Sequence, residues 1–289
     1  MAKRSILVQL DSDPQASVFD AVVALDADVD ELLRHSSVEV LHVRDLVYGA
    51  IFTRGGDDLK RTAIFIGGSN VGQGEELLKA VQSTFFGSLR VSVMLDSNGA
   101  NTTAAAAVLA ASRHVELKGA TALVLAATGP VGSRAVRLLA EQGARVGVAS
   151  RTLKKAEEVC RATKSRLKAA DITPVQSASS TETRVALEGV QIVIAAGAPG
   201  VELLPAELQK QSKSLKVAID LSAVPPLGLA AVEVTDKAKE RDGTICYGAL
   251  GIGGTKMKIH RAAIQRLFTA SDLVLDAEQI FQIGREIGA

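Results

Sequence analysis

Two side chains near the C-terminal end of the chain have the types and spacing to form one polar wall of a binding site. Lys256 and His260 are four residues apart, so in a helix they lie on one face, one turn from each other, whereas Lys258 points elsewhere. Residues 248–254 include four glycines, which favours a loop whose backbone can approach a ligand closely, with Thr255 capping the helix that follows. A solvated helix face is the alternative interpretation.

A dense run of polar and small residues occupies positions 96–103, directly after a stretch expected to be a strand over residues 90–95. Proteins of the α/β class place ligands at the carboxyl ends of their strands. Asn98, Thr102 and Thr103 are therefore candidate substrate-binding residues. Capping of the alanine-rich helix expected next is the alternative, but a run of this length exceeds what a cap requires.

A third candidate lies near the N-terminus, where Ser17 is placed to cap a helix with Phe19 and Asp20 in its first turn. Because only 3% of the residues are aromatic, an aromatic ring beside a carboxylate next to a loop could stack on a flat ligand. The alternative is a core phenylalanine followed by an aspartate that the helix dipole favours.

A phosphate-binding turn is indicated in the middle of the chain. The apolar run 123–125 is typical of a buried parallel strand, and an amphipathic helix follows Gly132. Between them, the fingerprint G-x-G-x-x-G has alanine in place of its first glycine, at Ala127, so the turn there is expected to form without a positive φ. The helix N-terminus would bind a pyrophosphate through its free N–H groups. The candidate cofactor-binding residues here are Thr128, Gly129, Pro130 and Val131.

The end of the next expected strand, at Ser150 and Arg151, indicates which dinucleotide binds. NAD-dependent enzymes have a carboxylate there for the ribose 2′-hydroxyl, but this chain has none, and Arg151 can pair with a 2′-phosphate. The sequence therefore predicts NADP, although a solvated basic helix start would also explain the lysines that follow. Ala196 and Gly197, at the end of the strand expected over residues 192–196, are predicted to lie at the nicotinamide.

The spacing of these segments predicts an α/β fold with two domains. Strands and helices alternate first in an N-terminal α/β domain over residues 1–103, then in a Rossmann-type parallel-sheet dinucleotide-binding domain over residues 104–269. A C-terminal helix within residues 270–289 is expected to pack back on the first domain. The strands expected in the first domain cover residues 5–10, 38–43, 50–53, 62–66 and 90–95.

Composition excludes several classes of function. The 33 basic and 32 acidic residues give a net charge of +1, which argues against a general nucleic-acid or membrane-surface binder. The chain has no apolar run of membrane-spanning length and no signal-peptide pattern, and a cytoplasmic location is expected. Its two cysteines and four histidines lack metal-ligand spacing, so reduced thiols and no metal site are predicted.

Taken together, these motifs closely resemble the NADP-dependent methylene-tetrahydromethanopterin dehydrogenases of methylotrophic bacteria, which are similar in fold to bacterial methylene-tetrahydrofolate dehydrogenases. The resemblance extends over essentially the whole chain, and Ala127 is a departure from it. The motifs that carry it are residues 17–20, 64–68, 96–99 with 101–103, 128–132 and 248–254 with Lys256 and His260.

The resemblance implies hydride transfer from the methylene group of the pterin to NADP⁺, giving the methenyl pterin in one-carbon metabolism. It also implies a homotrimer in which a neighbouring subunit lines a cleft between the domains. The residues that it places at the pterin are Phe19, Thr103, Lys256 and His260, assisted by Asp20, Asn98 and Thr102, and it places Gly251 and Ile252 at the cofactor.

The product methenyl carbon is a cation delocalised over two nitrogens, so the enzyme's main task is to position the reactants. Lys256 is expected to point to pterin oxygens, because a lysine cation beside the forming cation would be unfavourable. Two alternatives stay open at this point. One is a methylene-tetrahydrofolate dehydrogenase, and the other is a non-catalytic NADP-binding sensor.

Overall fold

The computed structural model describes residues 3–289, which form two compact units. Unit 1 contains the chain up to Thr102 together with Met257–Ala289, and unit 2 contains Thr103–Lys256. Both boundaries fall inside helices, namely α4 (Ala100–Ser112) and α9 (Ala249–Leu267). The structure thus groups residues 257–269 with the first unit rather than the second, because side chains of α9 such as His260 pack on the sheet of unit 1.

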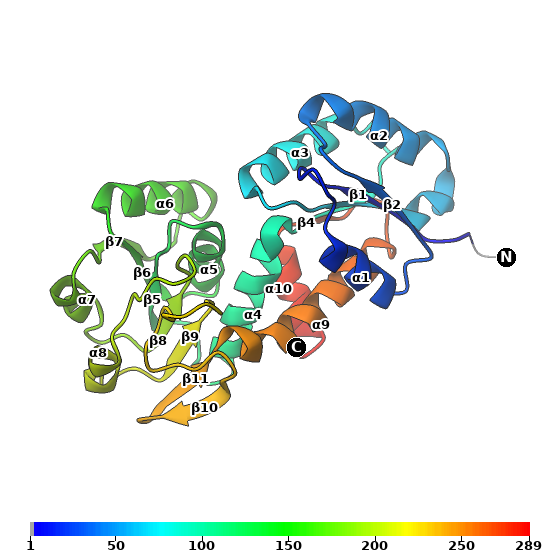
Figure 1. The fold of residues 1–289 in the computed structure, drawn as a ribbon. Coiled ribbons are helices and arrows are strands. Elements are labelled where there is room, and N and C mark those ends of the chain that lie inside the picture. The colour runs from blue at the N-terminus through cyan, green and yellow to red at the C-terminus, as the bar shows by residue number, and fades with distance from the viewer. Residues whose placement is uncertain (1–2) are drawn as a thin grey trace. The chain divides into compact units, whose positions relative to one another are not determined.

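The centre of unit 1 is a five-stranded parallel sheet in the order β12-β4-β3-β1-β2 (Figure 1). The chain enters the sheet at β1, adds β2 on one side, and then adds β3, β4 and β12 on the other. This order places a topological switch between β1 and β3, where α/β sheets bind ligands. The strands are β1 (Ile6–Leu10), β2 (Glu31–His35), β3 (Thr62–Ile66), β4 (Ser92–Leu95) and β12 (Val274–Leu275).

Apolar side chains of the strands form a core with the helices α2 (Val40–Phe52) and α3 (Val71–Thr84), which cover one face of the sheet (Figure 1). The helices α1 (Val18–Asp26) and α10 (Ala277–Glu286) complete the unit. Ser17 caps α1 as predicted, since its side chain accepts a hydrogen bond from the backbone N–H of Asp20. In α10, Ile280 and Ile283 are buried. Ile287, which follows the last residue of this helix, is 45% exposed.

Two of the strands predicted in this unit are wrong. Residues 38–43 and 50–53 were expected to be extended because of their β-branched and aromatic side chains, but residues 40–52 form the helix α2. Its buried residues Val43, Val47, Ala50 and Ile51 recur at the spacing of a helix face, and this packing outweighs the local propensity. The strand β2, which was not predicted, is a polar edge strand without an apolar pattern.

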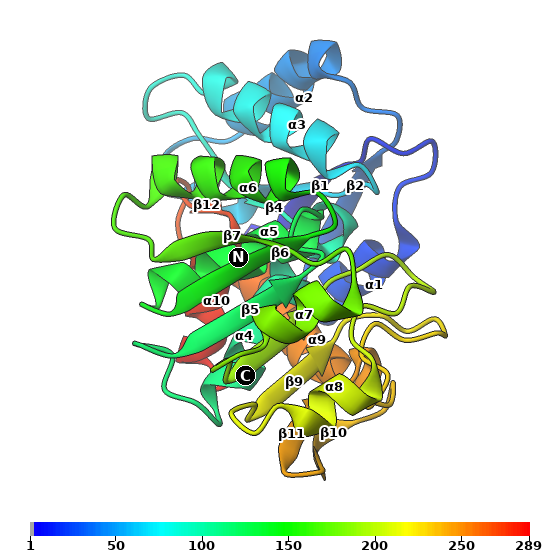
Figure 2. The ribbon, with the colours of Figure 1, turned by 90° about the vertical axis from the view of Figure 1, so that its left-hand side faces the viewer.

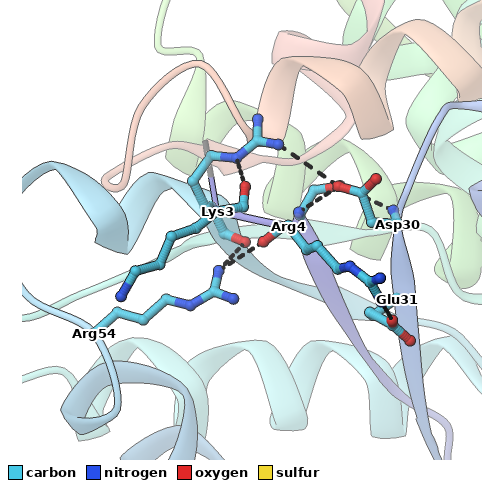
Figure 3. Close-up of polar contacts among 7 residues, drawn as sticks. Lys3, Arg4, Asp30, Glu31 and Arg54 are labelled. Carbon is cyan, nitrogen blue, oxygen red and sulfur yellow. Dashed lines mark hydrogen bonds and ion pairs between the residues drawn. The ribbon is translucent and has the colours of Figure 1, made fainter. Parts of the chain in front are cut away.

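Two arginines tie the amino ends of the unit 1 strands together (Figure 3). Arg54 donates to the carbonyl oxygens of Arg4 and Arg61 at 2.9 and 2.7 Å, and Arg61 donates to that of Lys3 at 2.9 Å. Beside them the carboxylate of Asp30 accepts the backbone N–H of Ser5 at 2.6 Å, and this hydrogen bond lowers the pKa of Asp30. This network therefore lies away from the carboxyl ends of the strands, where α/β sheets bind ligands.

Unit 2 contains a seven-stranded sheet in the order β10-β11-β9-β8-β5-β6-β7, in which β10 alone of these strands runs antiparallel to its neighbour (Figure 2). The predicted α/β class with a parallel-sheet dinucleotide-binding domain is confirmed. The strands are β5 (Thr121–Leu125), β6 (Arg145–Ser150), β7 (Ile172–Gln176), β8 (Ile192–Ala195), β9 (Val217–Asp220), β10 (Lys237–Arg241) and β11 (Thr244–Tyr247).

Helices flank this sheet. The helix α5 (Pro130–Glu141) buries Val136, Leu139 and Ala140, which have the i, i+3, i+4 spacing of the amphipathic helix predicted after Gly132. The other helices are α6 (Leu153–Arg166), α7 (Ser180–Ala186) and α8 (Ala206–Gln211), and apolar residues of α7 and α8 join one core cluster on the sheet.

Both cysteines lie buried in unit 2 and form no disulfide. Cys160 is in α6 and Cys246 in β11. Burial raises the pKa of the Cys160 thiol, and it raises that of Cys246 to about 11.

The stability of unit 2 should depend on pH through Asp236. Burial works against ionisation, but the guanidinium of Arg241, at 2.7 and 2.8 Å, and the backbone N–H of Glu233 lower the pKa of Asp236 overall. A lowered pKa in the folded state means that this stabilisation is complete above the unfolded carboxyl's pKa and is lost as the pH falls through the folded value.

Asp236→Asn should therefore lower the free energy of unfolding at pH 7, and its difference from the wild type should shrink as the pH approaches 3. Urea unfolding at a series of pH values measures this difference. A difference that stays constant over this range would contradict the role given to Asp236.

Candidate functional site

The turn between β5 and α5 in unit 2 has the geometry of a phosphate-binding turn. The positive φ falls at Ala126, at 52°, one residue before the position where the sequence fingerprint lacks its glycine. Ala127 keeps the strand pairing, because its N–H donates to the carbonyl of Ala149 at 2.9 Å. Gly129 is the N-cap and Pro130 opens the helix, so the N-terminus of α5 faces out of the turn.

The two remaining glycines of the fingerprint have different roles. A Cβ at Gly132 would lie 2.8 Å from the Cα of Ala127 and 2.9 Å from the carbonyl oxygen of Ala126, so this glycine lets the helix pack on the strand. A Cβ at Gly129 would meet no protein atom closer than 3.7 Å. That distance is an ordinary van der Waals contact, so the protein itself does not require a glycine at that position. Thr128 and Pro130 are exposed beside it.

The strand order of unit 2 reverses between β5 and β8, which brings a second predicted segment to this turn. The carbonyl oxygen of Ala196 lies 3.7 Å from the Cβ position of Gly129, and the Cβ position of Gly197 lies 3.7 Å from the Cβ of Ala126. The structure therefore brings Ala196 and Gly197 close to residues 126–129, while their place at a nicotinamide stays a prediction.

Ser150 and Arg151 follow at the carboxyl end of β6, the strand next to β5. The hydroxyl of Ser150 is buried and accepts the backbone N–H of Thr152 at 3.3 Å. Arg151 is exposed. The arrangement presents a cation at the place where a dinucleotide fold binds the adenosine ribose.

The prediction of a glycine loop before Lys256 is wrong, because residues 249–254 already belong to α9 and Thr255 lies inside that helix. A Cβ at Gly251 would overlap the carbonyl oxygen of Asp236, so close helix packing accounts for this glycine. Ile252 is buried. The assignment of Gly251 and Ile252 to the cofactor stays a prediction.

In unit 1, carboxylates gather at the switch between β1 and β3. Asp11 follows β1, is fully buried, and accepts the backbone N–H groups of Asp13 and Ser17 at 2.9 Å each. A Cβ at Gly67, directly after β3, would lie 3.3 Å from carboxylate oxygens of both Asp11 and Asp20. Asp20 is half-buried, so its carboxylate lies at this edge of the sheet and can accept hydrogen bonds from a ligand.

The neighbouring strand β4 ends in a network that orders the predicted polar run. Asp96 accepts the backbone N–H groups of Asn101 and Thr102 at 2.9 and 3.0 Å, and the hydroxyl of Thr102 at 2.6 Å. Thr102 is fully buried and holds the start of α4 in this conformation. This agrees with the alternative that the polar run caps the helix. Asn98, which follows β4, has a φ of 54° and is exposed, and its role at the substrate stays a prediction.

Three aromatic rings of unit 1 lie close to one another. His260 is fully buried and stacks on Phe65, with ring centroids 5.6 Å apart and an interplanar angle of 25°. The ring of Phe19 lies 6.4 Å from the same imidazole, between centroids, and Phe19 is 51% exposed. The prediction that Lys256 and His260 share a helix is confirmed. Lys256 and Thr103 are half-buried in α9 and α4, and both belong to unit 2.

Two carboxylates at strand ends were not singled out from the sequence. Asp11 follows β1 and Asp220 ends β9, and both are buried and accept backbone hydrogen bonds. An aspartate at the end of an apolar strand is the signal that could have identified them. Within residues 3–289, no group of three or more His, Cys, Asp or Glu side chains is arranged to hold a metal, and no helix is long and apolar enough to cross a membrane.

Comparison with known proteins identifies the family. Residues 18–98 match the family model described as methylene-tetrahydromethanopterin dehydrogenase, N-terminal. The chain is 43% identical over 286 residues to the bifunctional protein MdtA of Methylorubrum extorquens, an alignment that covers 98% of this chain and 99% of the relative. The chain belongs to the methylene-tetrahydromethanopterin dehydrogenase family. It is therefore an enzyme, an NAD(P)-dependent dehydrogenase of one-carbon metabolism.

A second relative agrees with this assignment, and a solved structure shares the fold. The NAD(P)-dependent methylenetetrahydromethanopterin dehydrogenase of the same organism is 29% identical over 294 residues, covering 98% of this chain and 99% of that one. Quinate dehydrogenase from Corynebacterium glutamicum, solved in complex with NAD, shares the fold at 12% identity, with a TM-score of 0.57 and coverage of 98% and 100%. In this methylene-tetrahydromethanopterin dehydrogenase family member, unit 2 has the architecture that binds a dinucleotide.

Proposed function

We propose that this enzyme transfers a hydride from the methylene group of methylene-tetrahydromethanopterin to NADP⁺. The observation that carries the proposal is the set of side chains near the carboxyl ends of β1 and β3. There Phe19 lies beside His260, and the carboxylate of Asp20 lies beside Gly67. A flat pterin suits an aromatic face, and its amino and amide groups suit a carboxylate.

The proposed cofactor fits the residues present in unit 2. The N-terminus of α5, with Gly129 as its N-cap, suits a pyrophosphate. Arg151 would pair with the 2′-phosphate of NADP, and Ala196 and Gly197 would border the nicotinamide. When bound, the nicotinamide supplies the hydride acceptor.

The chain's own contribution is positioning. Phe19 packs on the pterin, and Thr103 donates a hydrogen bond to it, while Thr102 holds the start of the same helix in place. Lys256 donates to pterin oxygens, and the buried His260 fixes the ring of Phe19. No general acid or base is needed, because the methenyl product is stabilised by its own two nitrogens.

The experiment that tests the proposal measures NADPH formation with methylene-tetrahydromethanopterin and with methylene-tetrahydrofolate. We expect turnover with the first pterin and lower kcat/KM with the second. A higher kcat/KM with methylene-tetrahydrofolate would reverse the proposed preference. Binding of NADP without turnover of either pterin would indicate a sensor instead.

Arg151→Ala should lower kcat/KM for NADP by about tenfold or more, since a hydrogen-bonded charge pair is worth about 1.5–3 kcal/mol. The value for NAD should hardly change, because NAD has no 2′-phosphate. Lys154→Ala is the control, an equally exposed cation in the same segment, and should change neither value by more than about twofold. Equal losses with NADP and NAD would contradict the role of Arg151.

The proposed assembly is a homotrimer. Unit 1 exposes several large apolar side chains on α1 and α2, among them Leu25 at 58%, Leu41 at 72% and Phe52 at 56%, and these support association between copies. Light scattering should give the mass of three chains. The mass of one chain would contradict this assignment.

A further inference from the structure

Asp220 in unit 2 has a structural role that the proposed reaction does not use. It ends β9 and is 1% exposed. One of its carboxylate oxygens accepts the backbone N–H of Ser222 and the other that of Leu229, each at 2.9 Å. Burial raises the pKa of Asp220 although backbone hydrogen bonds from Leu229, Ser222 and Gly228 oppose this shift. The carboxylate of Asp220 thus forms hydrogen bonds near both ends of the loop 221–229.

This loop is bonded in turn to the segment that follows β8. The carbonyl of Gly228 accepts the N–H groups of Leu203 and Leu204 at 2.8 and 3.0 Å, and that of Val224 accepts the N–H of Gly200 at 3.2 Å. The main chain must pass close to the carboxylate here, since a Cβ at Gly228 would lie 2.9 Å from an oxygen of Asp220. The two loops are therefore joined by backbone hydrogen bonds.

The same segment reaches the proposed pyrophosphate turn. The side chain of Leu203 lies 2.8 Å from the Cβ position of Gly197, and that position lies 3.7 Å from the Cβ of Ala126. These neighbouring segments connect Asp220 through Leu203 and Gly197 to the turn, and the N–H of Ala196 donates to the carbonyl of Leu125, at the end of β5, at 3.1 Å. All of these residues belong to unit 2.

We propose that Asp220 is a positioning residue for the dinucleotide, because its carboxylate holds the loop 221–229, and through Leu203 the segment at Gly197, against the turn at Ala126. The inference rests on the proposed dinucleotide site of unit 2. It does not depend on which pterin is the substrate. Asp220 itself need not touch the dinucleotide.

The test is Asp220→Asn, which keeps the size of the side chain but presents an NH₂ group to one of the two backbone N–H donors. We expect the Kd for NADPH, measured by fluorescence titration, to rise about tenfold, the effect of losing one hydrogen bond to a charged group. The KM for NADP should rise with it, while kcat at saturating NADP and the KM for the pterin stay within about twofold of the wild type.

Two further variants keep the test decisive. Gly228→Ala adds a methyl group that displaces the same loop without changing a charge. It should also raise the Kd for NADPH, and it can be measured even if Asp220→Asn fails to fold. Asp30→Asn removes a carboxylate that accepts a backbone N–H in unit 1, and it should leave NADPH binding unchanged.

The outcomes separate the two proposals. A wild-type protein that binds neither NADPH nor NADH would overturn the dinucleotide site, and this inference with it. A wild type that binds NADPH, together with folded variants at Asp220 and Gly228 that bind it equally well, would overturn the positioning role alone. A fall in kcat with an unchanged KM for NADP would also overturn it, because the loop would then act on the reaction and not on binding.

Discussion

Gly129→Ala should lower the affinity for NADPH by at least about tenfold and leave the stability of unit 2 nearly unchanged, whereas Gly132→Ala should destabilise the unit itself. An added methyl group at Gly129 would make only ordinary van der Waals contact with the protein, the nearest atom being the carbonyl oxygen of Ala196 at 3.7 Å, and it would lie where the pyrophosphate is proposed to bind. Loss of the glycine N-cap should cost less than about 1 kcal/mol.

At Gly132 the added methyl group would lie 2.8 and 2.9 Å from backbone atoms of Ala127 and Ala126, which cannot rotate away as a side chain could. Overpacking of this kind costs about 1–3 kcal/mol. Calorimetric unfolding and titration with NADPH distinguish the two effects. If Gly129→Ala binds NADPH as tightly as the wild type, no phosphate approaches the backbone there.

Lys256→Ala should reduce turnover by more than tenfold without changing the affinity for NADP. Lys256 is half-buried in α9, one turn from His260, and we expect its ammonium group to orient the pterin through its oxygens. The measurement is steady-state kinetics with methylene-tetrahydromethanopterin, accompanied by NADPH titration.

Lys258→Ala is a matched control, because this lysine lies two residues further along the same helix and is exposed. It should retain nearly full turnover. If Lys256→Ala retains turnover as well, or if both variants lose it equally, the lysine has no specific role at the pterin.

The strands with continuous apolar runs were predictable from the sequence. Thr62–Ile66 and Ile192–Ala195 are buried along their whole length, so burial and propensity favour the same conformation. In α2 these two influences disagree. Its residues have the propensity of a strand, and only contacts with the sheet and α3 select the helix. No pattern confined to residues 40–52 contains those contacts.

The candidate site shows the same limit. The turn at Gly129 and the strand ends at Ala196 and Asn98 were predictable, since each follows an apolar strand. The glycines of residues 248–254 suggested a flexible loop, but Gly248 and Gly251 allow α9 to approach the carbonyl groups of Glu233 and Asp236. The partner segment is distant in sequence, so composition alone could not distinguish flexibility from close packing.

The burial of Cys160 and Cys246 has a practical consequence for experiments on this enzyme. With the pKa of both thiols raised by burial, few thiolates exist near neutral pH, and thiolates are the species that react with maleimides. A single cysteine introduced at an exposed position would therefore be labelled in preference to the native pair. A fluorophore could thus be attached to either unit without first replacing the two native thiols.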